Sequence, residues 1–164
     1  MRKRLEYGIA ALFFAAIALG YTHGYQQLSA AAERYALAAD IETLRSATRQ
    51  RALAERQGGG SVAELDGANP VDWLDEPPGG YQGEHAAGGE GAAELDGGAW
   101  YFDTDAEVLI YRVLHPERFC GGAPEGPPSL RVRVVAGADV ESALGADLEL
   151  IEPYDWDEAC ARNE

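Results

Sequence analysis

The chain has 164 residues and a formal net charge of −15 at neutral pH, because 28 acidic residues outnumber 13 lysines and arginines. This length leaves room for one domain of about 100 residues beside an N-terminal segment. A surface so acidic offers no basic patch to a phosphate backbone, so the composition excludes nucleic acid as a partner.

The N-terminus combines a basic start with a long apolar stretch. Residues 1–6 contain three bases and one acid, and residues 7–25 carry no formal charge. A run of this length predicts a transmembrane helix, and its basic flank places residues 1–6 in the cytoplasm and the rest of the chain in the periplasm. The alternative is a secretory signal peptide cleaved after Gly20. A retained anchor is favoured, because a helical pattern rather than a loop follows Gly20.

Residues 26–57 predict an amphipathic stalk helix that continues the membrane helix. The segment is rich in alanine, contains neither Gly nor Pro, and ends at three consecutive glycines, residues 58–60. Apolar residues recur at spacings of three and four along two neighbouring stripes. The first stripe is Leu28, Ala31, Ala32, Tyr35, Ala38 and Ala39, and the second is Leu37, Ile41, Leu44 and Thr48.

Residues 58–98 are rich in Gly, Pro and acids and predict a variable loop, with Trp73 and Tyr81 docking on the core in places. From residue 99 to residue 164 the pattern changes to strands and a C-terminal segment. The predicted strands are Trp100–Asp103 and Val108–Leu114 as a hairpin, Leu130–Val134, and Leu148–Pro153 as an edge strand because of its proline. The fold class is therefore α+β: a long N-terminal helix packed on a small antiparallel sheet of about four strands.

The two cysteines, Cys120 and Cys160, predict one disulfide in an oxidising compartment. Metal chemistry has one candidate, a turn in which Asp103, Asp105 and Glu107 alternate and could ligate Ca²⁺. Solvated turn acids are the favoured interpretation, because the run lacks the spacing of a known calcium loop. The three histidines are scattered and form no constellation with a nucleophile, so we expect neither an enzyme nor a cofactor.

A series of motifs resembles a known superfamily. It runs through Asn69-Pro70, Pro77-Pro-Gly-Gly-Tyr-Gln-Gly83, Gly98-Ala-Trp-Tyr-Phe-Asp103 and Leu109-Ile-Tyr-Arg-Val113. Together with the order of helix, loop and sheet, the series resembles type IV pilins and type II secretion pseudopilins. The pilin-like accessory proteins of the mannose-sensitive haemagglutinin pilus system are the most similar group. Glu6 lies close behind Met1 with no processing glycine before it, so we expect that a prepilin peptidase does not cut this chain.

The resemblance implies a non-enzymatic, single-pass inner-membrane protein that takes part in the assembly of a type IV pilus or a secretion pseudopilus. Its partners would be pilin or pseudopilin subunits, platform proteins and membrane lipid. The membrane helix would pack laterally through small residues and a carboxylate near its start. These are Glu6, Gly8, Ala11, Ala15 and Ala18. The alternative function is an acidic periplasmic binding module, released by signal peptidase and dependent on calcium.

Overall fold

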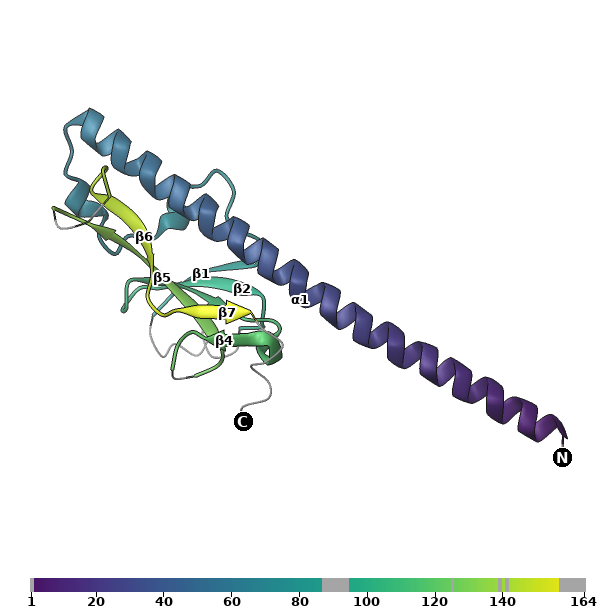
Figure 1. Ribbon diagram of the computed structural model, residues 1–164. Coiled ribbons are helices and arrows are strands. Elements are labelled where there is room, and N and C mark those ends of the chain that lie inside the picture. Colours follow the sequence, from purple (N-terminus) through teal and green to yellow (C-terminus); the bar gives the residue numbers. More distant parts are fainter. Residues whose placement is uncertain (1, 87–94, 125, 139, 141, 157–164) are drawn as a thin grey trace.

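The computed structural model describes the backbone of residues 2–86, 95–124, 126–138, 140 and 142–156, and within these ranges the side chains from Leu28 onward. A single helix, α1 (Arg2–Gly58), begins the fold and extends far beyond the sheet that packs on its second half (Figure 1). The helix ends where the sequence predicts, and Gly59 adopts the left-handed conformation at φ 76°. The helical prediction for residues 26–57 is therefore confirmed.

Over the described residues the main sheet has five strands and is mixed, which corrects the prediction of an antiparallel sheet of about four strands. Its strand order is β1-β2-β3-β5-β6, and only the pairing of β1 with β2 is parallel. The strands are β1 (Tyr81–His85), β2 (Ala99–Asp103), β3 (Val108–Arg112), β5 (Ser129–Ala136) and β6 (Ala146–Leu150). A second, two-stranded sheet pairs β4 (Phe119–Gly121) with β7 (Tyr154–Trp156).

The predicted hairpin is confirmed, because β2 and β3 pair in register with Trp100 opposite Tyr111. β6 is an edge strand, as predicted, but it ends at Leu150, so Pro153 is not the reason. The predicted loop, residues 58–98, contains β1 and two short 3-10 helices. These are η1 (Val62–Leu65) and η2 (Pro70–Trp73). Trp73 and Tyr81 pack against the core, as expected.

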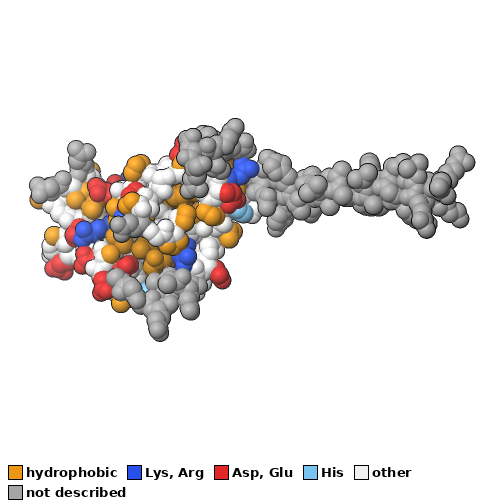
Figure 2. Space-filling model, turned by 90° about the horizontal axis from the view of Figure 1, so that it is seen from below, with side chains coloured by type: hydrophobic (Ala, Val, Ile, Leu, Met, Phe, Trp, Pro, Cys, Tyr) orange, Lys and Arg blue, Asp and Glu red, His pale blue; other side chains and the backbone are white. Residues whose placement is uncertain are grey.

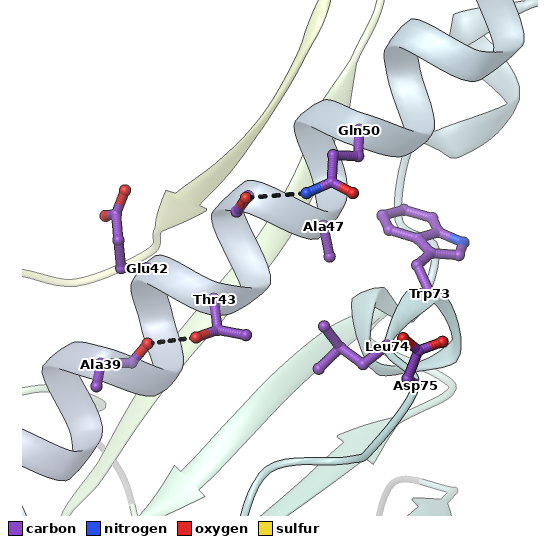
Figure 3. A pocket seen from close by; sticks show the side chains of 9 residues that line it. Ala39, Glu42, Thr43, Ala47, Gln50, Trp73, Leu74 and Asp75 are labelled. Atoms are coloured by element: carbon purple, nitrogen blue, oxygen red, sulfur yellow. Dashed lines mark hydrogen bonds between the residues drawn. The ribbon is translucent and has the colours of Figure 1, made fainter.

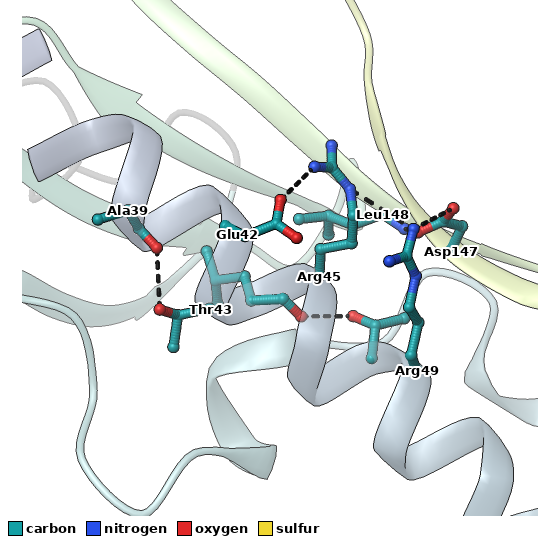
Figure 4. A network of polar contacts seen from close by, with 9 residues as sticks. Ala39, Glu42, Thr43, Arg45, Arg49, Asp147 and Leu148 are labelled. Atoms are coloured by element: carbon teal, nitrogen blue, oxygen red, sulfur yellow. Dashed lines mark hydrogen bonds and ion pairs between the residues drawn. The ribbon is translucent and has the colours of Figure 1, made fainter. Parts of the chain in front are cut away.

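The core lies between α1 and one face of the sheet. The second stripe of α1 is buried against it, and Thr48 fits this apolar setting because its hydroxyl donates to the carbonyl of Leu44 at 2.9 Å. The first stripe is not core: Leu28 is 73% exposed and Tyr35 is 75% exposed. A salt-bridge network adds polar contacts between α1 and β6, where Arg49 lies 3.3 Å from Asp147 (Figure 4).

Among the residues whose side chains the structure describes, no helix is both long and apolar enough to cross a membrane. The side chains of the predicted span, residues 7–25, are not among those described, and neither are those of the predicted packing residues. These are Glu6, Gly8, Ala11, Ala15 and Ala18. The structure therefore does not support the membrane span, which stays a prediction.

Candidate interaction surface

A buried carboxylate fixes α1 to the end of β3. Glu33 is only 7% exposed and lies on the buried face of the helix. It accepts three hydrogen bonds: from the Tyr111 hydroxyl at 3.0 Å, from the Leu114 amide at 2.6 Å and from the His115 amide at 3.0 Å. Burial and the adjacent Glu33 charge raise the pKa of the Tyr111 phenol, so the tyrosine remains a donor. This buried charge is satisfied entirely by hydrogen bonds from the sheet domain.

A second contact of the same kind lies two turns further along the helix. The indole of Trp100, which is fully buried, donates through Nε1 to Asp40 at 3.0 Å. Burial raises the pKa of Asp40, and the hydrogen bond from Trp100 opposes that shift. Tyr111 and Trp100 also contact each other, with ring centroids 5.0 Å apart. Two aromatic residues of the motif series thus connect the sheet to the helix.

Asn69 holds η2 in place. Its side-chain oxygen accepts from the Val71 amide at 3.2 Å and caps the short helix, in which Pro70 occupies the first turn. Its Nδ2 donates to the Tyr81 hydroxyl at 2.9 Å and to Glu84 at 3.1 Å. The Asn-Pro and Tyr-containing motifs, separate in the sequence, therefore meet in one hydrogen-bonded cluster.

The position of η2 creates a groove along α1 (Figure 3). The groove has a volume of about 610 Å³ and lies on the outer side of the helix, away from the sheet. One wall is helical and the other is formed by the end of η2 and the two residues after it. The lining residues are Ala39, Glu42, Thr43, Ser46, Ala47 and Gln50 of α1, with Trp73, Leu74 and Asp75. A smaller hollow of about 290 Å³ adjoins it and shares Ala47, Gln50 and Trp73.

The polar residues on the floor of the groove bond within their own helix. The Thr43 hydroxyl donates to the carbonyl of Ala39 at 2.8 Å, and the Gln50 amide donates to Ser46 at 3.2 Å (Figure 3). The rest of the helical wall consists of the methyl groups of Ala39 and Ala47 and the side chain of Glu42. The facing wall carries the half-buried side chains of Trp73 and Leu74 and the exposed Asp75. The arrangement can therefore bind an apolar surface without leaving these helix donors unpaired.

The groove continues the exposed stripe of α1. Tyr35, Ala39 and Thr43 are exposed and follow one another at intervals of four, and Ala47, one turn further along the same row, is buried. Hydrophobic side chains also reach other parts of the surface, and Figure 2 shows them gathered among acidic and basic side chains on one face of the domain. The sequence analysis identified the stripe without saying which face of the helix the sheet covers, and it did not identify the groove.

The predicted calcium residues do not form a cation site. Asp103 accepts from the amides of Asp105 and Ala106, at 3.0 and 3.1 Å, and so closes its own turn. Glu107 instead pairs with Arg133 at 2.8 Å. Within the described ranges, no group of three or more His, Cys, Asp or Glu residues could hold a metal ion.

Ser29, His115 and Glu117 form a linear array that sequence reasoning missed. The Ser29 hydroxyl lies 2.9 Å from His115 Nε2, and His115 Nδ1 lies 3.3 Å from Glu117. Although the order matches that of a hydrolase triad, Ser29 sits inside α1, where backbone amides already donate to the preceding turn. Those amides are therefore not free to stabilise an oxyanion, and the array links α1 to the segment that follows β3.

Two further predictions concern the disulfide and the family resemblance. Cys120 is disulfide-bonded, whereas Cys160 lies outside the described residues, so their pairing stays a prediction. The family resemblance also stays a prediction. Comparison of the chain with protein-family models, with curated proteins and with solved structures finds no match.

Proposed function

We propose that this chain is a non-enzymatic, pilin-like membrane protein that takes part in the assembly of a type IV, haemagglutinin-type pilus or a related secretion pseudopilus. The observation that carries the proposal is the two-sided character of α1. One side is fixed to the sheet by a buried stripe and by Glu33, while the opposite side presents Leu28 and Tyr35 to the surroundings.

Two features favour association as the mechanism. A helix that extends beyond its own domain offers a long surface to neighbouring helices, and large apolar side chains exposed on it contribute to binding once they are covered. The domain is also held in a fixed position relative to the helix, because Glu33 and Asp40 accept hydrogen bonds from residues of β3 and β2. In the proposed arrangement the helix is anchored in the inner membrane, the domain is periplasmic, and pilin subunits or platform proteins bind along the helix.

Deletion and complementation in the native host test the proposal. We expect that loss of the gene abolishes surface pili seen by electron microscopy and lowers haemagglutination, and that the wild-type chain restores both. Tyr35→Asp, which places a charge on the exposed stripe, should fail to restore them. The matched control is Leu150→Asp, which changes an exposed leucine on β6 and should complement fully. Normal piliation of the deletion strain would refute the proposed function.

A further inference from the structure

Among the residues that the structure describes, none covers the groove between α1 and η2, and the chemistry of the groove specifies what could fill it. We infer that it binds an amphipathic α-helix of another protein, one with an aliphatic stripe flanked by Lys or Arg. This inference goes beyond the proposed function, because it names the chemistry of a partner at the groove and holds for any assembly in which the protein acts.

The shape of the groove favours a helix. Ala39, Thr43 and Ala47 are small residues one turn apart, and small residues allow two helix axes to approach to about 8 Å. From Ala39 to Gln50 the groove follows about 17 Å of helix, or three turns. An extended peptide would gain little here, because the amides of α1 are bonded along the helix and cannot pair with a strand.

The apolar side chains that line the groove favour a partner helix with an apolar stripe. Trp73 and Leu74 stand opposite the small helix residues, so leucine-sized side chains of the partner can fill the space between the two walls. Aromatic side chains in such half-buried positions are typical centres of binding energy at interfaces. Trp73 is therefore the residue whose surroundings should change most on binding.

The charges around the groove indicate which charged residues should flank the apolar stripe of the partner helix. Glu42 is balanced by Arg45 at 2.8 Å, and Arg51 is balanced by Glu55 of its own helix. Among the described residues neither Asp72 nor Asp75 forms an ion pair, so the η2 side of the groove is acidic. Charge complementarity thus calls for Lys or Arg on the partner. It also disfavours a second copy of this chain, whose formal net charge is −15.

Fluorine NMR of the full-length chain, labelled with 5-fluorotryptophan and held in nanodiscs of neutral phospholipid, tests this inference at the groove itself. The chain has three tryptophans, so Trp73→Phe assigns the Trp73 signal. The probe is a synthetic helical peptide of about 14 residues with a leucine stripe flanked by lysine, long enough for three turns. We expect it to shift the Trp73 signal in a saturable way and to leave the other two tryptophan signals unchanged. The same peptide with glutamate flanks should bind at least tenfold more weakly.

Two variants with matched controls locate the site. Thr43→Arg fills the middle of the groove and should weaken peptide binding at least tenfold, whereas Ala38→Arg adds the same charge outside the groove lining and should weaken it little. Asp75→Lys should reduce binding of the lysine-flanked peptide about three- to fivefold, as expected for an exposed charge, whereas Glu149→Lys on β6 should not.

Three results would overturn the inference. The first is a Trp73 signal that the lysine-flanked peptide does not shift, and the second is equal binding of the two peptides. The third is a Trp73 signal that shifts when the protein alone is concentrated, which would assign the groove to a second copy. Loss of piliation in the deletion strain does not bear on these readouts, so the inference and the proposed function can fail separately.

Discussion

Tyr111 and Glu33 are 78 positions apart in the sequence and share a buried hydrogen bond of 3.0 Å, in which the phenol donates to the carboxylate. The same carboxylate accepts two backbone amides from the residues that follow β3. Its position therefore decides where α1 rests on the sheet, and the pair gives the most direct test of the helix–sheet junction.

Removal of the Glu33 carboxylate should lower the free energy of unfolding more than removal of the Tyr111 hydroxyl does. Glu33→Ala leaves the Tyr111 hydroxyl and two amides without their acceptor and should lower the free energy of unfolding by about 3 kcal/mol. Tyr111→Phe removes one donor of three and should cost about 1–2 kcal/mol. Urea unfolding of both single variants and the double variant measures the coupling. Glu42→Ala, a surface carboxylate of the same helix, is the control and should change stability by less than about 1 kcal/mol. Additive single effects would mean that the hydrogen bond contributes no stability.

Stability should fall at alkaline pH, because the pKa of Tyr111 is raised above its ordinary value of 10.0 by burial and by Glu33. The folded protein keeps the phenolic proton after the unfolded chain has released it. The contribution of this group is therefore complete below about pH 10 and is lost as the pH rises towards the folded pKa.

Urea midpoints of the wild type and Tyr111→Phe, measured from about pH 8 to about pH 11, test this dependence. The variant should show the smaller decline. A decline remains in both chains, because burial also raises the pKa values of Tyr81, Tyr101 and Tyr154. Parallel curves for the two proteins would show that Tyr111 does not titrate differently in the folded and unfolded states.

The sequence predicts the local elements of this fold better than the contacts between distant ones. The β2–β3 hairpin and the helix end follow from alternation and from glycines, which act over a few residues. β1 could not be predicted, because Tyr81 is the only large apolar residue in its sequence and its partner strand is parallel, so only tertiary structure pairs them. The three-residue strands β4 and β7 are equally dependent on a distant partner.

The candidate interaction surface could not be predicted for the same reason, because it depends on contacts between residues that are far apart in the sequence. Two stripes of α1 have suitable spacing for burial, and periodicity alone does not say which one the sheet covers. The side of α1 that the sheet covers includes Glu33, although a hydrophobic pattern would place an acidic residue in solvent. Glu33 is buried there because three donors of the sheet domain form hydrogen bonds with its carboxylate. The groove depends on η2, whose position is set by the contacts of Asn69 with β1.

Gly80 should be intolerant of a side chain, whereas its neighbour Gly79 should not be. Gly80 has φ 77°, and a Cβ atom there would lie 2.7 Å from the carbonyl oxygen of Gly98, which is backbone and cannot move aside. We expect Gly80→Ala to lower the free energy of unfolding by about 2 kcal/mol or more. Gly79→Ala meets nothing within 4 Å and should be nearly neutral. Urea unfolding of both variants provides the comparison, and equal stabilities would contradict the close approach of the two chain segments.

Asn69→Asp separates the two roles of this residue. Aspartate caps a helix as well as asparagine does, so the bond from the Val71 amide should survive. The new carboxylate cannot donate to Tyr81 or Glu84, and it faces the negative charges of Glu84 and Asp72. Like charges raise its pKa above that in the unfolded chain, so the folded protein binds the proton more tightly and the destabilisation grows as the pH rises.

Thermal unfolding measures this effect at two pH values. At neutral pH we expect Asn69→Asp to cost about 2 kcal/mol relative to the wild type, and at about pH 4 a smaller amount. Because Asn69 also positions η2, the fluorine signal of Trp73 should move in the same variant at neutral pH, while the other two tryptophan signals stay in place. An unfolding difference that does not depend on pH would show that the lost donor, rather than charge repulsion, causes the whole effect.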